Sequence, residues 1–159
     1  MHSFEMRPNG AAYIKVNFAA LDGKRMVSKS FMFDTGATRT TIPMNLLTSM
    51  GYTREWLTKN KIIIPKDKQP LMADGRRLNA YGIPAMRLMI SGHEILHNGY
   101  FLTSDEATNL GFLLGADILS YFDIFFKYSE WRVYFEFRKE MLHPAENPGD
   151  AFAYSMHND

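Results

Sequence analysis

The chain has 159 residues, of which 46% are hydrophobic and 14% aromatic, and its formal net charge is +1. We therefore expect a single globular domain over residues 1–159, with its core at about residues 12–137. The near-neutral charge and scattered basic residues argue against a nucleic-acid partner, and the absence of cysteine excludes disulfides and a thiolate nucleophile.

No apolar stretch reaches the length of about 18 residues that a membrane-spanning helix needs. We expect no membrane insertion by this segment and a soluble domain. The sequence does not distinguish a cytoplasmic from a periplasmic location, so the compartment stays open.

The first third of the chain predicts a hairpin followed by two short helices. Apolar and polar residues alternate over residues 13–18, Asp22-Gly23 is typical of a tight turn, and a second strand covers residues 26–33. Pro43 opens a helix that Gly51 stops, and a second helix is expected over residues 54–59. A β-branched run predicts a strand over residues 62–64.

One carboxylate, Asp34, directly follows the apolar run Phe31-Met32-Phe33 and lies on a glycine turn. A carboxylate at the end of a buried strand costs several kcal/mol unless hydrogen bonds or a shared proton compensate. Gly36 gives the turn its backbone freedom, and the hydroxyl of Thr35 can brace it. The triplet by itself also fits an ordinary turn aspartate, so the rest of the chain has to decide.

The middle of the chain predicts a second hairpin with Asp74-Gly75 at its tip. A charged tip with a glycine suits a mobile lid, and it suits an ordinary exposed hairpin equally well. Two further strands are expected over residues 86–90 and 95–102, with Ser91-Gly92 as the turn between them.

The last third predicts a second glycine turn and one clear amphipathic strand. An apolar run enters the turn at Gly115, where Asp117 is expected to cap a helix over residues 118–121. Residues 131–137 alternate between apolar and polar side chains, as a strand with one buried face does. Residues 139–159 contain prolines and a glycine, and we expect a tail of uncertain order.

Phe-Asp-Thr-Gly-Ala-Thr at residues 33–38 resembles the active-site motif of aspartic peptidases, and its single copy in a short chain resembles the retropepsin-like branch, of bacterial or retroviral type. The apolar run followed by Gly115-Ala116-Asp117 is similar to the second glycine turn of that family, and the Asp74-Gly75 hairpin stands where the family has its flap. The resemblance spans roughly residues 12–137. It implies a mainly β fold, a closed β-barrel or sandwich of hairpins with one flap and two or three short helices.

The resemblance further implies an aspartic-type endopeptidase that acts on peptide or protein substrates without a metal or cofactor. Because the chain has one Asp-Thr-Gly, it implies a homodimer in which two Asp34 carboxylates share a proton and activate a water. The residues that the resemblance assigns are Asp34 as the catalytic residue, Thr35, Gly36 and Ala37 as its support, Ala73, Asp74, Gly75 and Arg76 as the flap, and Gly115 and Asp117 in the second turn.

The chain departs from many retroviral members at two positions that brace the dimer. Those members have an acidic residue after the first motif and an arginine in the second turn, where this chain has Thr38 and Ala116. Arg39 and Asp117 are a candidate substitute pair.

Two other interpretations stay open. His93-Glu94-Ile95-Leu96-His97 matches the zinc peptidase pattern H-E-x-x-H, which requires a helix. Here glycine turns flank the motif, and on a strand the two histidines would be about 13 Å apart, too far for one metal. The main alternative is a binding or dimerisation module that keeps the fold without turnover.

Overall fold

The computed structural model describes residues 1–71, 74–106 and 111–138. The predictions for Ala73 and for the tail over residues 139–159 lie outside these described residues. The single domain over residues 1–159 therefore stays a prediction.

The largest sheet has the strand order β7-β6-β2-β3-β9 and contains the first predicted hairpin. Strands β2 (Tyr13–Ala19) and β3 (Met26–Phe33) pair antiparallel on either side of the Asp22-Gly23 turn, as predicted. The remaining strands are β6 (Leu88–Ile90), β7 (His93–Ile95) and β9 (Leu113–Leu114). Strand β9 runs parallel to β3, so the second glycine turn is delivered beside the first.

A second sheet has the order β4-β5-β8, with β4 (Ile62–Ile63), β5 (Tyr81–Pro84) and β8 (Tyr100–Thr103). Thr41 links this sheet to the first one, because it forms a bridge with Leu102 of β8 and another with Leu113 of β9. The residues that follow the Asp34 turn thus lie between the two sheets.

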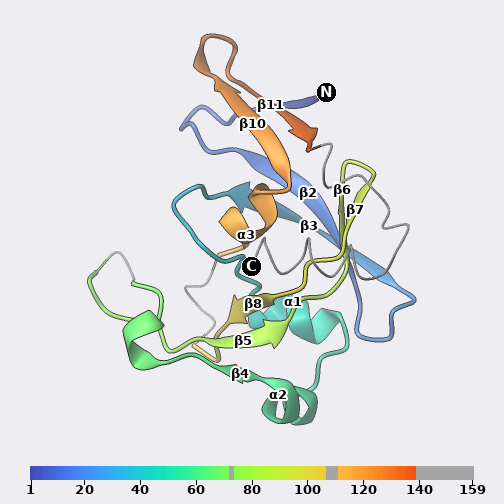
Figure 1. The fold of residues 1–159 in the computed structure, drawn as a ribbon, viewed down its shortest axis with the longest axis vertical. Coiled ribbons are helices and arrows are strands. Elements are labelled where there is room, and N and C mark those ends of the chain that lie inside the picture. The colour runs from blue at the N-terminus through green and yellow to red at the C-terminus, as the bar shows by residue number, and fades with distance from the viewer. Residues whose placement is uncertain (72–73, 107–110, 139–159) are drawn as a thin grey trace.

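The third sheet has the order β1-β11-β10 and joins the two ends of the described chain. Its strands are β1 (His2–Glu5), β10 (Phe122–Lys127) and β11 (Arg132–Phe137). The β10–β11 hairpin extends at the top of Figure 1, with the N-terminal strand beside it and α3 at its base.

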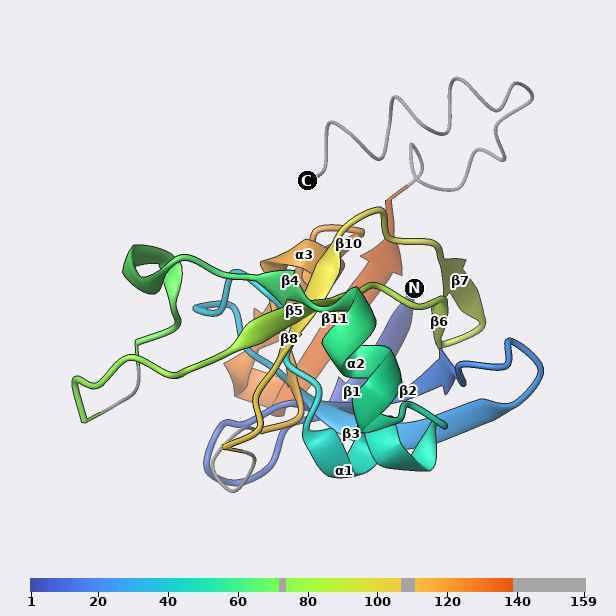
Figure 2. The same ribbon diagram turned by 90° about the horizontal axis from the view of Figure 1, so that it is seen from below.

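The helices are short and lie near their predicted positions. They are α1 (Met44–Ser49), α2 (Arg54–Asn60) and α3 (Ala116–Leu119), with single 3-10 turns η1 (Lys66–Lys68) and η3 (Tyr128–Glu130). In Figure 2, α1 and α2 lie side by side on the face towards the viewer. No helix in the described residues is long and apolar enough to cross a membrane.

One hydrophobic cluster connects the sheets and helices. Phe18, Phe31 and Phe101 lie at its centre and are fully buried, with ring centroids 5.1 Å apart for Phe18 and Phe31 and 6.4 Å apart for Phe18 and Phe101. These rings come from β2, β3 and β8, so the first two sheets share one core. This core fixes the strand β3 that carries Asp34.

The mainly β fold of hairpins, with three short α-helices in the described residues, agrees with the prediction, and several details differ from it. The described sheets have linear strand orders, so these residues form no closed barrel. The strand predicted over residues 95–102 is two strands, β7 and β8, because the chain turns at Asn98-Gly99 to enter another sheet. Strands β1, β5 and β10 were not predicted.

Replacing Leu88 with alanine should lower the free energy of unfolding by about 2–5 kcal/mol, because its fully buried side chain would leave a cavity in β6. The matched control Leu96→Ala removes a side chain that is 67% exposed, and we expect a change within about 0.5 kcal/mol. Chemical denaturation at one protein concentration measures both. Equal losses in the two variants would contradict the described core.

Candidate active site

Asp34 is the first residue after β3, and its carboxylate is half-buried. One carboxylate oxygen accepts a hydrogen bond from the backbone N–H of Gly36 at 3.1 Å, and the N–H of Ala37 donates to the Asp34 carbonyl at 3.1 Å. The turn therefore holds the carboxylate through its own backbone. Thr35 and Gly36 are exposed beside it, and Ala37 is half-buried.

The parallel pairing of β3 with β9 brings the second predicted turn against the first. Met32 lies opposite Leu113 and Phe33 opposite Leu114, and the N–H of Asp34 donates to the Leu114 carbonyl at 3.0 Å. Both strands therefore end at the same level. This parallel pairing places the two glycine turns side by side, although Asp34 and Gly115 are 81 positions apart in the sequence.

Gly115 permits the closest approach between the two turns. A Cβ atom at this position would lie 2.6–2.8 Å from the backbone N, C and O atoms of Arg39, which is closer than real Cβ contacts. The backbone N–H groups of Ala116 and Asp117 also donate to the carbonyls of Ala37 and Thr38, at 2.8 and 3.2 Å. No residue other than glycine fits at 115 without moving the first turn.

Asp117 is 93% buried, and its carboxylate is the polar centre of this contact. It accepts hydrogen bonds from the Thr40 N–H at 2.9 and 3.0 Å, from the Thr40 hydroxyl at 2.8 Å and from the Ile118 N–H at 2.9 Å. The Thr40 hydroxyl oxygen in turn accepts from the Gly115 N–H at 3.1 Å. A buried carboxylate with this many donors is structural, since its hydrogen bonds replace the lost hydration.

Comparison with a solved structure identifies the fold. A crystal structure of a retropepsin-like aspartic protease from Rickettsia conorii is similar with a TM-score of 0.52 and 17% sequence identity, over 83% of this chain and 86% of that chain. The chain has a retropepsin-like fold. The retroviral protease-like domain of Ddi1 from Leishmania major is also similar, with a TM-score of 0.42 and 14% identity over 86% of this chain and 97% of that chain.

At these identities the likeness concerns the retropepsin-like fold alone. No protein-family model matches the sequence, and no curated protein matches it. The chemistry of the site therefore has to be argued from the residues of this chain.

The hairpin predicted as a flap is present on this retropepsin-like framework. Leu71 and Arg77 form an antiparallel bridge, and Gly75 between them has a φ of +86°, which favours glycine. The backbone N–H and side chain of Arg76 donate to Asp74 and lower the pKa of that carboxyl. The hairpin projects from the body of the molecule in both Figure 1 and Figure 2, and no hydrogen bond between described residues ties it to the Asp34 turn.

The candidate pair of Arg39 and Asp117 does not form, and this prediction was wrong. The Arg39 guanidinium lies over the Tyr100 ring at 4.2 Å, a cation–π contact, while Thr40 and Ile118 occupy the Asp117 carboxylate. Contrary to the prediction, Asp117 is also not the N-cap residue of the helix that follows the second glycine turn. It lies inside α3, whose N-cap residue is Gly115.

The H-E-x-x-H segment begins on strand β7, not on a helix, as the flanking glycine turns predicted. The His93 ring stacks on Phe137 with centroids 4.9 Å apart, whereas His97 is buried beside Tyr121, with 3.2 Å between its Nδ1 and the tyrosine hydroxyl. Among the described residues, no three His, Cys, Asp or Glu side chains gather in a way that could hold a metal ion.

Thr40 is the site residue that the sequence analysis missed. It is completely buried, donates to Asp117 and accepts from Gly115. The two threonines before the apolar Ile42-Pro43 segment were the available signal, but the partner of Thr40 is 77 positions away in the sequence. Local patterns do not reveal such a partner.

Replacing Asp117 with asparagine should lower the free energy of unfolding by about 1–3 kcal/mol, because an amide turns one accepting oxygen into a donor facing other donors. Asp67→Asn is the matched control, since Asp67 is exposed on η1 and should tolerate the change. Denaturation of the three proteins at equal concentration measures this. An Asp117→Asn protein as stable as wild type would show that the buried network does not hold the turns together.

Proposed function

We propose that the protein is an aspartic endopeptidase that works as a homodimer, with Asp34 from each copy forming the catalytic pair. Three features support this proposal: the Asp-Thr-Gly motif, its position directly after a buried strand, and the retropepsin-like fold. The half-buried Asp34 carboxylate has one backbone donor, which leaves oxygen lone pairs available for a water and for a second carboxyl group.

The observation that carries the proposal is that, within the described residues of the two turns and the hairpin, Asp34 is the one carboxylate suited to this chemistry. Asp117 lies in the second of the paired turns, but it is buried and its oxygens accept bonds from Thr40 and Ile118. Asp74 is exposed and bound to Arg76 within its own hairpin. The second carboxylate of an aspartic pair therefore comes from another copy, and a two-fold axis beside Asp34 provides it.

In this dimer the two Asp34 carboxyl groups hold one proton between them, since adjacent carboxylates do not both ionise. The ionised group removes a proton from a bound water, whose oxygen attacks the peptide carbonyl carbon, while the protonated group gives its proton to the carbonyl oxygen. The resulting diol collapses as the C–N bond breaks. The amine nitrogen takes one proton from the pair, and the diol returns one, so the pair ends in its starting state without any metal or cofactor.

The substrate of this reaction is an extended peptide with apolar residues around the cleaved bond. Backbone groups of the exposed Gly36 and of the hairpin at Asp74-Gly75 bind the main chain of the peptide. Ala73 and Arg76 complete the hairpin in its role as a flap, and Thr35 ties the two turns together across the axis. Ala37 supports the backbone of the Asp34 turn.

Asp34→Asn should abolish peptide cleavage and leave the fold intact, because the amide removes the base while its oxygen still accepts the Gly36 N–H bond. The assay is cleavage of a peptide library from acidic to neutral pH, with circular dichroism to check folding. Asp67→Asn, an equal change on an exposed turn, should retain full activity.

Adding a chelator to the same assay distinguishes the aspartic mechanism from the other candidate functions. Cleavage that a chelator abolishes, or cleavage at the wild-type rate by Asp34→Asn, would contradict the aspartic mechanism. A folded dimer that cleaves no peptide at any pH would instead indicate a binding or dimerisation module.

A further inference from the structure

Strand β10 leaves one long backbone edge open. It pairs with β11 on one side, and no described residue pairs with its other side. Its six residues include neither proline nor glycine, and an open edge of this kind offers N–H and C=O groups to another strand. The other edge strands, β1, β4, β7, β8 and β9, have two to four residues, so β10 with six is better suited to adding a strand.

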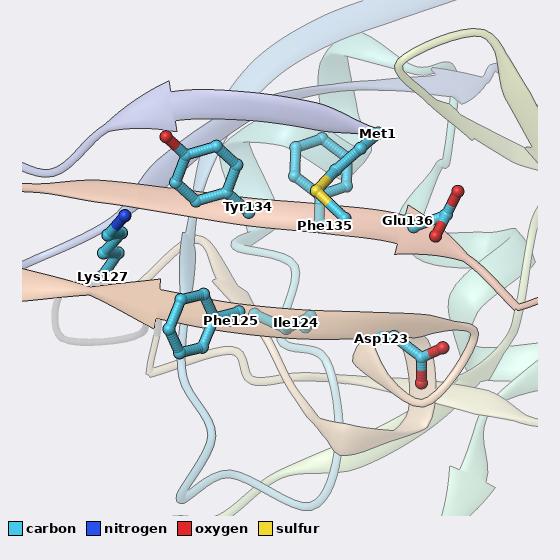
Figure 3. A pocket seen from close by; sticks show the side chains of 8 residues that line it. All are labelled: Met1, Asp123, Ile124, Phe125, Lys127, Tyr134, Phe135 and Glu136. Atoms are coloured by element: carbon cyan, nitrogen blue, oxygen red, sulfur yellow. The ribbon is translucent and has the colours of Figure 1, made fainter. Parts of the chain in front are cut away.

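The surface beside this edge is apolar at its centre. Phe125 is 60% exposed and lies opposite Tyr134 of β11, and Figure 3 shows Met1 farther along the same strand, beside Phe135. These side chains help to line a hollow of about 410 Å³, and Figure 3 draws the residues that line it. An exposed phenylalanine in the middle of an open edge strand is typical of an interaction surface.

The two ends of this surface carry opposite charges. At one end Asp123 lies directly opposite Glu136, and within the described residues neither has an ion-pair partner. Like charges in this position repel, so this end lacks a cation. At the other end Lys127, which Figure 3 labels, lies opposite Arg132 in the strand pairing. There, glutamates of the same chain already offset part of the positive charge.

We propose that β10 pairs antiparallel with β10 of a second copy, about a two-fold axis at Phe125. In this register Phe125 lies opposite the partner's Phe125, and Asp123 lies opposite the partner's Lys127. The same pairing is made twice, since the interface is isologous. The two three-stranded sheets then become one six-stranded sheet.

The charges specify this register. A shift by one residue would place Asp123 opposite the partner's Phe126 or Tyr128, so both ion pairs would be lost and the side chains would change faces. The central register also places Ile124 opposite the partner's Phe126, which joins two half-buried apolar side chains. The sequence of β10 is therefore complementary to itself.

This inference rests on the proposed function, for which it supplies the dimer surface. Two residues, Ser120 and Tyr121, separate β10 from α3, the helix that follows the second glycine turn. Arg138 fixes this junction, because its backbone N–H donates to the Tyr121 carbonyl at 2.9 Å and its guanidinium to the Ser120 carbonyl at 2.8 Å. The pairing edge is thus connected to the Asp34 site by a short segment that is held at both ends.

A charge-exchange experiment tests the surface. Asp123→Lys and Lys127→Asp each place like charges opposite each other at both symmetric pairs, and each should raise the dimer dissociation constant at least about tenfold. An equal mixture of these two variants should form a heterodimer of near wild-type affinity, because both pairs then join opposite charges. Asp67→Lys, the same change on the exposed turn η1, is the control and should not alter association.

Sedimentation velocity over a dilution series measures association, and circular dichroism checks that each variant is folded. The proposal is overturned if wild type is monomeric throughout, if the single variants associate like wild type, or if their mixture stays monomeric. Failure of the proposed function gives a different result: association follows the charges as expected, but no variant and no wild-type dimer cleaves peptides. A third result is that cleavage requires Asp34 while dimer formation does not respond to these charges. That result would support the proposed function and reject β10 as the dimer surface.

Discussion

The buried carboxylate of Asp117 accepts hydrogen bonds from Thr40 and from the start of α3, and these bonds hold two distant turns of the chain in contact. Gly115 makes the contact possible, since any side chain there would collide with the backbone of Arg39. A buried charge is tolerated in a protein only when such donors surround it. The geometry of the Asp34 turn depends on this network.

The two aspartates therefore have separate roles. Asp117 is enclosed, with its oxygens engaged by donors from both turns, while Asp34 is half-buried with one backbone donor at the Gly36 N–H. A carboxylate that is positioned by its backbone and still accessible suits proton transfer. The proposed aspartic mechanism needs a second such group, which we propose a second chain supplies, and the open edge of β10 is the surface proposed for that pairing.

The sequence predicted those parts of the structure that local signals encode. Alternation and the Asp22-Gly23 turn located β2 and β3, Pro43 and Gly51 bounded α1, and the glycines marked both turns of the site. Strand β10 was missed because Phe122–Lys127 contains four apolar residues among six and shows no clear alternation. The Asp117 to Thr40 bonds were missed because they depend on the parallel pairing of β3 with β9, which brings together residues remote in sequence.

Mixtures of wild-type protein with the Asp34→Asn variant test most directly whether each site uses Asp34 from two chains. At equal amounts, with subunit exchange complete and the total concentration above the dimer dissociation constant, random pairing places half of the wild-type protomers in mixed dimers. If both carboxylates are needed, peptide cleavage per wild-type protomer should fall to roughly half, and it should fall further as the variant is added in excess. Cleavage per wild-type protomer that stays constant in all mixtures would contradict a site shared between two chains.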